Sequence, residues 1–232
     1  MGDEYQLLVE SGVKEDSRQI LSILEQLRKG TLVTDLRLLN YFNEVPVSYP
    51  AIVENVEDDM VDMAVHQNQA VVMNHQKMTF LKSRHFPHDV VAKVFRSDVN
   101  KCLAIITRFS YAQIRAERRQ FVRVRLDSLI PASFRCDMGE ITGTIDDISI
   151  GGMCLRASQA SELETQARGT LKLVIEDSIL EIPAVLLKSK QEDEEFLYVF
   201  ECETDTKIET KIAQFIFQRQ LEIIRELKDH VL

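Results

Sequence analysis

The sequence predicts a mainly β protein built of two consecutive antiparallel β-barrel domains, with a short N-terminal helix and a long C-terminal helix. Short apolar segments bounded by Asn, Asp, Pro or Gly recur about every eight to twelve residues, which is typical of a sandwich or barrel. A polar stretch, residues 111–120, interrupts this rhythm, and the strand pattern restarts after it. We therefore expect a first domain over residues 1–112 and a second domain over residues 113–232.

In the first domain, residues 1–16 are polar, and we expect them to be loose. Apolar residues then repeat at helical spacing, which predicts a helix that Asp16 or Ser17 caps and that Gly30 ends. Short apolar segments between turn residues predict strands in the rest of the domain. These segments are residues 30–37, 49–57, 59–66, 69–74, 77–83, 88–96 and 102–110.

In the second domain, Val122, Val124 and Leu126 alternate with two arginines, which places Arg123 and Arg125 on one face of a strand. A broad apolar stripe predicts the closing helix from about Thr206 to His230, packed against its own barrel. Six further strands are expected between the arginines and this helix. They are residues 130–137, 140–149, 151–158, 169–177, 180–190 and 195–202.

Composition and charge exclude several classes of protein. The chain has 232 residues, of which 45% are hydrophobic and 28% charged, and its formal net charge is −9. The acidic balance argues against general binding to DNA, which favours basic domains. No apolar run approaches the roughly 20 residues that span a bilayer, and the acidic start has no signal-peptide layout. We expect a cytoplasmic protein that does not insert into a membrane.

Cysteine and histidine spacing indicates neither a metal site nor an active site. The four cysteines stand far apart without a C-x-x-C pair, so we expect buried free thiols. The histidines at 66, 75, 85 and 88 have irregular spacing and no accompanying carboxylate-histidine motif. No Ser-His-Asp or Cys-His arrangement is legible either. We expect no metal, no cofactor and no enzymatic activity.

A cluster of arginines stands out in this acidic chain: four lie in the ten residues "RAERRQFVRV", 115–124. Within it, Arg119 and Arg123 form an R-x-x-x-R motif, and Arg118 precedes it. Guanidinium groups fork onto phosphate oxygens and onto the O6/N7 edge of guanine, and they stack on bases. By itself, the cluster favours a solvated connector whose charges pair locally, because Glu117 is adjacent.

A second motif, "DDISIGG", follows 24 residues after the last arginine of the first motif. It contains D-x-S-x-x-G as Asp147, Ser149 and Gly152, with Gly151 before the last position. A carboxylate accepts from the donors on guanine's other edge, a hydroxyl adds a contact, and glycines let a backbone turn and approach a ligand. A plain hairpin turn is the alternative, but the order and spacing of the two motifs favour a guanine-nucleotide site.

At these residues the sequence resembles the PilZ domain, the bacterial receptor domain for cyclic di-GMP. The signature "RRQFVR" followed by "DDISIGG" carries the resemblance, which covers residues 115–232 and includes the closing segment "IAQFIFQRQLE". Through its layout, the N-terminal half is similar to the companion split barrel of the two-domain, YcgR-like flagellar brake proteins. The resemblance implies a cyclic di-GMP receptor that acts on motility, biofilm or another surface-lifestyle output through a protein partner, with the flagellar motor as the candidate.

The resemblance also implies residue roles. Arg119 and Arg123 would hold phosphate and guanine, and Asp147 and Ser149 would hold the other guanine edge, while Gly152 permits the turn. An arginine at position 118 favours two intercalated ligand molecules per chain. Because the first motif lies in the interdomain connector and the second on the barrel, a ligand that contacts both would change the interdomain arrangement.

Two rival functions stay open at this point. One is a DNA-binding regulator that uses the arginine cluster on the phosphate backbone, and the acidic balance opposes it. The other is an adaptor that has the fold but signals without a nucleotide, and the intact motif opposes it. A homodimer contact through the C-terminal helix is a further alternative.

Overall fold

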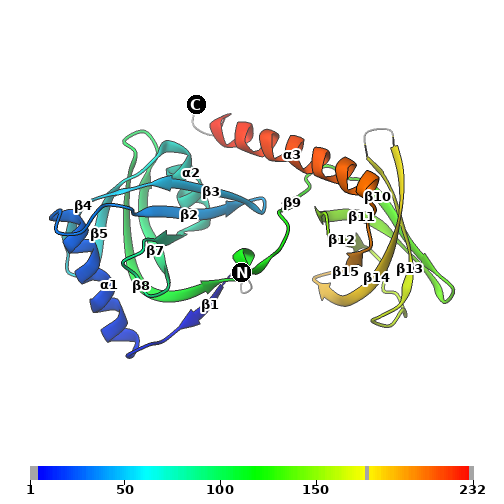
Figure 1. Ribbon diagram of the computed structural model, residues 1–232, viewed down its shortest axis with the longest axis horizontal. Coiled ribbons are helices and arrows are strands. Elements are labelled where there is room, and N and C mark those ends of the chain that lie inside the picture. The colour runs from blue at the N-terminus through cyan, green and yellow to red at the C-terminus, as the bar shows by residue number, and fades with distance from the viewer. Residues whose placement is uncertain (1–4, 176–177, 230–232) are drawn as a thin grey trace. The chain divides into compact units, whose positions relative to one another are not determined.

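The computed structural model describes residues 5–175 and 178–229, and contacts within these ranges divide the chain into two compact units (Figure 1). The first unit holds the described residues up to Phe42, residues 46–120 and those from Ile224 onward. The second unit holds residues 43–45 and 121–223. The chain therefore passes from one unit to the other after Gln120, and the domain boundary expected at residue 112 stays a prediction.

The first unit is one curled antiparallel sheet with two α-helices and a 3-10 turn. Its sheet runs in the order β3-β2-β6-β7-β8-β5-β4, and β1 pairs with β8 beside this path. The strands are β1 Tyr5–Leu8, β2 Arg37–Phe42, β3 Val45–Pro50, β4 Ile52–Glu57, β5 Met60–Ala64, β6 Met78–Lys82, β7 Asp89–Asp98 and β8 Leu103–Ile114. The helices are α1 Val13–Arg28, α2 Gln67–Gln76 and the 3-10 turn η1 Ala116–Arg118.

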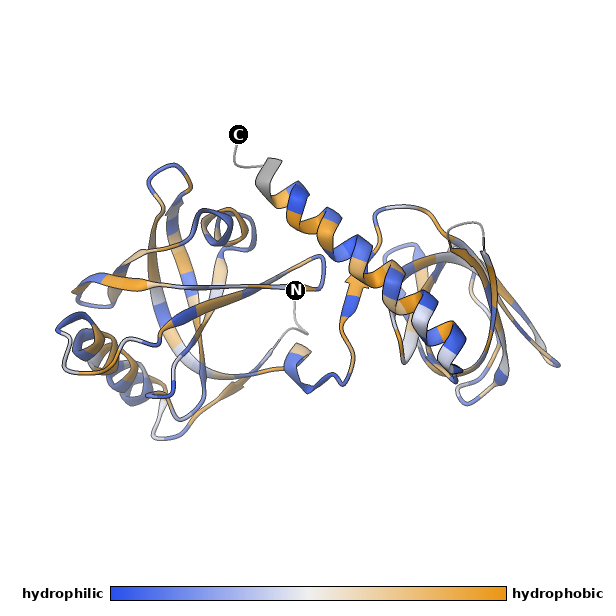
Figure 2. Ribbon diagram, turned by 45° about the horizontal axis from the view of Figure 1, so that its top comes forward, coloured by the Kyte–Doolittle hydropathy of each residue, from blue (hydrophilic) through white to orange (hydrophobic). Residues whose placement is uncertain are grey.

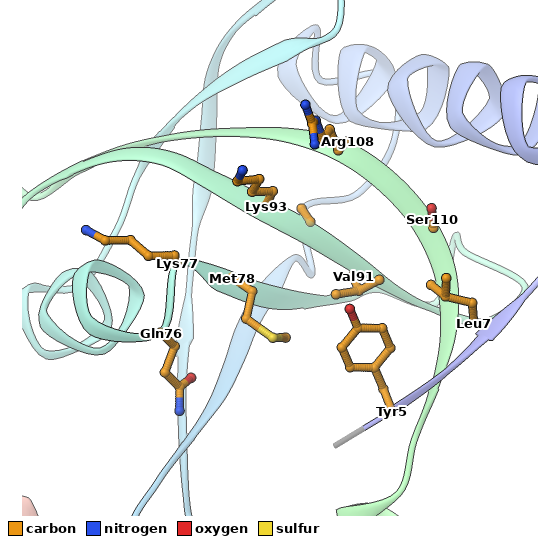
Figure 3. Close-up of a pocket in the computed structure, with 10 residues that line it drawn as sticks. Tyr5, Leu7, Gln76, Lys77, Met78, Val91, Lys93, Arg108 and Ser110 are labelled. Atoms are coloured by element: carbon orange, nitrogen blue, oxygen red, sulfur yellow. The ribbon is translucent and has the colours of Figure 1, made fainter. Parts of the chain in front are cut away.

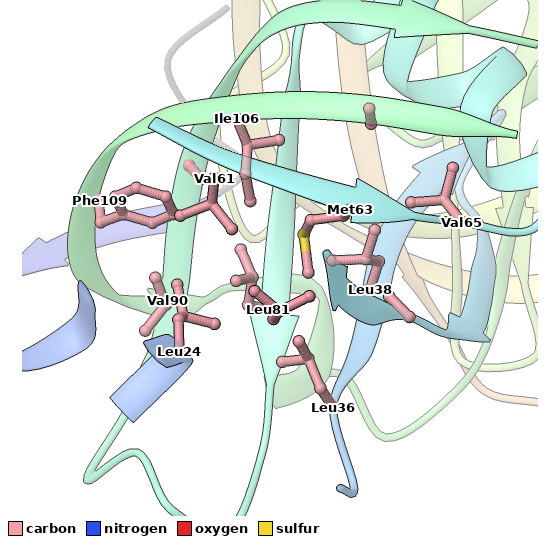
Figure 4. Close-up of a cluster of buried hydrophobic side chains, with 14 of the residues drawn as sticks. Leu24, Leu36, Leu38, Val61, Met63, Val65, Leu81, Val90, Ile106 and Phe109 are labelled. Carbon is pink, nitrogen blue, oxygen red and sulfur yellow. The ribbon is translucent and has the colours of Figure 1, made fainter. Parts of the chain in front are cut away.

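The core of the first unit fills the concave side of this sheet. Helix α1 contributes Ile20, Leu24 and Leu27, which are at most 5% exposed and belong to one buried cluster with the strand residues (Figure 4). Each fully buried Leu or Ile contributes about 1.5–3 kcal/mol to the free energy of unfolding. The amphipathic stripe predicted for this helix is thus what attaches it to the sheet.

The start of the chain differs from the expectation. Tyr5–Leu8 is not loose but pairs with β8 in the register Tyr5 to Ile114. Helix α1 begins at Val13, with Gly12 at the N-cap, instead of at the expected Asp16 or Ser17. Asp16 is buried, and its carboxylate accepts hydrogen bonds from the backbone N–H groups of residues 10 and 11. It therefore holds the preceding turn from inside the helix.

Two further expectations for the first unit were wrong. Residues 69–74 belong to helix α2, not to a strand, because the His66 ring caps the helix start and Lys77 ends it in a left-handed conformation. Residues 30–37 form no strand before Arg37, since Gly30 turns the chain and Thr31 donates back to the Gln26 carbonyl. The first unit consequently carries one more helix than predicted. The expected strand 49–57 is also divided between β3 and β4.

The second unit is a closed barrel. Its strands pair in the order β10-β13-β14-β15-β12-β11, and β10 also pairs with β11, which closes the ring. Strand β9 adds to β11 outside the ring. The elements are β9 Arg123–Arg125, β10 Pro131–Cys136, β11 Gly139–Ser149, β12 Gly152–Ala157, β13 Arg168–Ile175, β14 Ser178–Glu192, β15 Glu195–Cys202 and helix α3 Thr206–Asp229, whose residues from Ile224 onward belong to the first unit. The mainly β class and the long closing helix are confirmed.

The barrel interior is apolar and aromatic. The rings of Phe134 and Phe200 lie 4.6 Å apart inside it, and both side chains are at most 1% exposed. Polar and apolar residues alternate along α3 (Figure 2), where Asp205 caps the first turn by accepting from the Ile208 N–H. Phe217, on the helix that was expected to pack against its own barrel, is 61% exposed, and His230 lies outside the described residues.

The thiol prediction holds in part. All four cysteines are free. Cys154 and Cys202 are buried as expected, whereas Cys102 and Cys136 are only half-buried because each lies at a turn or strand end.

Candidate functional site

The arginine cluster begins where β8 ends. The 3-10 turn η1 forms because the N–H groups of Arg118 and Arg119 donate to the carbonyls of Arg115 and Ala116, at 3.1 and 3.2 Å. Arg118 and Arg119, the two predicted site arginines in this segment, are exposed. The Glu117 carboxylate in the same turn accepts from the Lys82 ammonium group on β6. The turn is thus anchored to the sheet by its acidic residue, which leaves its cationic side chains at the surface.

The second half of the candidate site lies on β9 and β11. These antiparallel strands place Arg123 opposite Ser149 and Arg125 opposite Asp147. The Arg123 guanidinium reaches diagonally to Asp147, with Nη1 donating to Oδ2 at 3.4 Å and Nε 3.3 Å from Oδ1. The side chains are 27% and 15% exposed, so the pair is mostly buried, and Nε of Arg123 and Oδ1 of Asp147 are buried atoms. Two residues 24 positions apart, singled out by sequence as one site, are in contact.

Ser149 closes the turn between β11 and β12. Its hydroxyl donates to the Gly152 carbonyl at 2.9 Å, and the residue is only 6% exposed. The structure therefore gives this serine a part in shaping the hairpin that carries Asp147, and the hydroxyl oxygen retains the capacity to accept a hydrogen bond.

The two glycines are needed for space, not for a left-handed backbone. Neither has a positive φ angle. A Cβ at Gly152 would lie 2.5 Å from the backbone oxygen of Phe200 on the neighbouring strand β15. A Cβ at Gly151 would lie 2.9 Å from the ring of Phe121. Gly152 thus permits close strand approach inside the barrel, while Gly151 receives an aromatic side chain from the arginine motif itself.

Phe121 is a residue of this site that motif reasoning missed. It lies between the two arginines of R-x-x-x-R, is 38% exposed and covers Gly151. Val122, expected to alternate into the core with Val124, is instead 49% exposed, because β9 starts only at Arg123. An apolar surface therefore accompanies the guanidinium groups, as base stacking requires.

A second ion-pair group, also missed, supports the hairpin from its other side. Asp146 accepts from Arg156 at 3.0 Å (Nε) and 2.7 Å (Nη2), and Arg156 also donates to Glu195 at 2.6 Å. The Arg125 guanidinium lies 3.5 Å from the same Asp146 carboxylate. Hydrogen bonds to Asp146 and Glu195 raise the pKa of the Arg156 guanidinium further. Asp146 is thus held by the barrel, whereas its neighbour faces the arginine motif.

Among the described residues, the side chains of Asp146, Asp147 and Cys154 bring potential metal-ligand atoms within 4.8 Å of one another. Burial and the neighbouring carboxylates raise the pKa of the Cys154 thiol to about 12, so it stays protonated near neutral pH. Protonated thiols are poor metal ligands. The two carboxylates instead form the ion pairs with Arg123, Arg125 and Arg156 described above.

The four histidines considered for a metal take separate roles. The His66 ring caps α2 and stacks on Tyr49 at 3.7 Å, and His75 lies near Phe42. His85 contacts the Val33 carbonyl, and His88 contacts the Glu10 carboxylate.

Across residues 5–175 and 178–229, no helix combines the length and apolar character needed to cross a membrane.

The predicted residues therefore fall in two groups. Arg123, Asp147, Ser149, Gly151 and Gly152 lie together in the second unit, on β9, β11, β12 and the turn between β11 and β12. The other two are Arg118, the last residue of η1, and Arg119, which follows it, and the chain contacts assign both to the first unit.

Residues 117–218 match the sequence model of the PilZ domain. An uncharacterized protein of Aquifex aeolicus (strain VF5) is 24% identical over 179 residues, which cover 76% of this chain and 86% of that protein.

Three solved structures are similar over most of both chains. YcgR from Escherichia coli in complex with c-di-GMP has a TM-score of 0.46 and 15% identity, covering 93% of this chain and 95% of YcgR. The inhibitor of motility MotI from Bacillus subtilis has a TM-score of 0.43 and 16% identity, covering 82% and 98%. MrkH from K. pneumonia in complex with c-di-GMP has a TM-score of 0.45 and 17% identity, covering 91% and 96%.

Proposed function

We propose that this protein is a receptor for cyclic di-GMP that regulates motility or a related surface-lifestyle output, because residues 117–218 match the PilZ domain. The observation that carries the proposal is the partly exposed ion pair between Arg123 and Asp147 on the β9–β11 ladder. A guanidinium and a carboxylate are complementary to the two hydrogen-bonding edges of guanine. The ligand also carries two phosphodiester charges, which the arginines neutralise.

The energies favour exchange of this ion pair for ligand contacts. In a mostly buried Arg–Asp pair such as this one, the cost of desolvating the two charges offsets much of their attraction, so the net contribution of the pair to stability is small. A bidentate arginine–guanine contact contributes about 1–3 kcal/mol. Arg123 can therefore leave Asp147 for the O6/N7 edge or a phosphate, and Asp147 then accepts from the N1 and N2 donors of guanine. Ser149 holds the turn and offers its oxygen, and Gly151 and Gly152 keep the turn free of side chains.

Arg118 and Arg119 extend the proposed site into the connector. Arg119 is four residues from Arg123, so their Cα atoms are at most about 14 Å apart along the chain, within reach of two long side chains and one dinucleotide. Both connector arginines are exposed. We assign Arg119 to phosphate and guanine, and Arg118 to stacking on a second, intercalated ligand molecule.

The output follows from this division of the arginines. A ligand that contacts η1 and the β11–β12 hairpin favours the interdomain arrangement in which both contacts form, and the shift in population equals its differential affinity for the two arrangements. The change offers a new surface to a protein partner, for which the flagellar motor is the candidate. We place this function in the cytoplasm, without catalysis, DNA binding or membrane insertion, and with a homodimer as an alternative assembly.

The test is isothermal titration of the purified chain with cyclic di-GMP, beside an Arg119→Ala, Arg123→Ala double variant. We expect saturable binding by the wild type and at least a hundredfold loss in the double variant, because two charge-assisted contacts of about 1.5–3 kcal/mol each disappear. An Arg118→Ala variant should lower a stoichiometry near two to one.

Arg115→Ala is the matched control, because it removes the same charge from the same segment outside the motif. It should retain wild-type affinity. An absence of binding by the folded wild type would refute the receptor function and favour the nucleotide-independent adaptor. Retention of DNA with a steep dependence on salt would favour the DNA-binding regulator instead.

A further inference from the structure

A cavity lies in the first unit, on the outer face of the sheet. Its volume is about 630 Å³, and β1, the end of α2, β6, β7 and β8 line it (Figure 3). The side chains of Tyr5, Met78 and Val91 gather on one side of it, and Leu7, which is 57% exposed, extends this apolar surface. The Tyr5 ring is fixed edge-on against Phe80 at 5.5 Å. This volume is within the range of small-molecule sites.

Three cationic side chains line the same cavity: Lys77, Lys93 and Arg108. None of the described lining residues is acidic, although the chain as a whole carries a net charge of −9. Lys77 donates to the side chain of Asn74 at 2.9 Å. Lys93 and Arg108 lie beside each other in Figure 3 and take part in none of the ion pairs among the described residues. The cavity is thus a local positive site on an acidic protein.

The backbone at two of these cations is in the left-handed region. Lys77 has φ 59° at the C-terminus of α2, and Arg108 has φ 58° within β8. Arg108 lies in a bulge, because the register of β7 on β8 shifts between Val91 and Lys93. Glycine is the usual residue for this conformation, and other residues are strained there. Long cations at both places, on one cavity, point to a role for their side chains.

We propose that this cavity binds an organic anion with one acidic head group and an apolar body, of the class of alkyl phosphates and fatty carboxylates. Lys93 and Arg108 contact the head group, with Lys77 adding charge at the rim. Tyr5, Met78 and Val91 contact the apolar body. The site is separate from the nucleotide motif, since all its lining residues lie in the first unit before Ile114.

The test is titration of the full chain with octyl and decyl phosphate as monomers, beside inorganic phosphate and octyl glucoside. Burial of the ligand's alkyl chain predicts that each added methylene tightens binding by up to about fourfold. Attraction of the head group to the cations predicts weaker binding at high salt. Inorganic phosphate lacks the apolar body and octyl glucoside lacks the charge, so both should bind at least tenfold more weakly than octyl phosphate. Vesicles with anionic lipid test whether the source is a membrane.

The variant is Lys93→Gln with Arg108→Asn, because asparagine tolerates the left-handed backbone and so preserves the bulge. It should weaken decyl phosphate binding about tenfold or more, with cyclic di-GMP binding unchanged. Arg96→Gln with Lys101→Gln is the matched control, on β7 and in the turn between β7 and β8, outside this cavity. The Arg119→Ala, Arg123→Ala protein should bind decyl phosphate normally, which separates this proposal from the nucleotide site.

Three results would overturn the proposal: no binding of decyl phosphate, affinity independent of chain length, or equal loss in the variant and the matched control. Binding to anionic vesicles without binding to monomeric alkyl phosphate would likewise reject a cavity for a single chain. It would indicate a peripheral membrane contact instead.

Discussion

Substitution of Gly152 by alanine tests the packing that shapes the β11–β12 hairpin. The added Cβ would lie 2.5 Å from the Phe200 carbonyl oxygen, a backbone atom of β15 that cannot rotate away. Overpacking of this kind costs about 1–3 kcal/mol, and the stiffer unfolded chain returns about 0.4–1 kcal/mol. We therefore expect the second unit to lose about 1–2 kcal/mol of unfolding free energy. At about 4–8 °C per kcal/mol for a unit of this size, its melting temperature should fall visibly.

Gly151→Ala is the matched control, since it adds the same methyl group one residue away. Its Cβ would meet only the Phe121 ring, which is partly exposed and can move. This variant should keep wild-type stability in urea unfolding, yet weaken cyclic di-GMP binding severalfold by displacing Phe121 next to the arginines. Equal stability of the two variants would refute the reasoning that close approach of β15 requires Gly152.

Three further predictions concern stability and reactivity. Burial raises the pKa of the Asp89 carboxyl, so the protonated form is favoured in the folded state. The resulting stability is fully present below about pH 4 and is lost as pH rises through the folded-state pKa. Asp89→Asn should flatten that part of the dependence of unfolding free energy on pH, measured by urea unfolding. Burial raises the pKa of Cys154 and Cys202 to about 12. In the native protein, a thiol reagent should therefore label these two roughly a thousandfold more slowly than an ordinary thiol, and it should label the half-buried Cys102 and Cys136 first. Arg156→Ala leaves Asp146 without its closest partner and should cost about 1–3 kcal/mol in chemical denaturation, which Lys at this position should partly restore.

The strand order of a barrel could not be predicted from the sequence, but most of its strands could. Alternation identified β10 to β15 because one face of each is buried in the ring. The same reasoning failed at residues 69–74, where a short apolar run fits either a strand or a helix. A capping histidine and buried polar residues such as Gln69, not periodicity, decide for the helix there.

The candidate site shows a similar division. Its charged pair followed from motif spacing, since the chemistry of Arg123 and Asp147 is visible in their residue types. The contact of Phe121 with Gly151 was not visible, because it depends on where β9 begins. The opposite orientation of Asp146 was also hidden, since it depends on a register shift between Ile145 and Asp147. Local irregularities in a β ladder leave no signal in a single sequence.

The central claim is that Arg123 and Asp147 recognise guanine and not merely phosphate. The most direct measurement is the ratio of the affinities of the wild-type chain for cyclic di-GMP and cyclic di-AMP, by isothermal titration. The two ligands carry the same charge, but adenine presents a different donor and acceptor pattern at both edges. We predict binding of cyclic di-GMP at least tenfold tighter than that of cyclic di-AMP. Equal affinities would contradict guanine recognition and reduce the site to a cluster of positive charge.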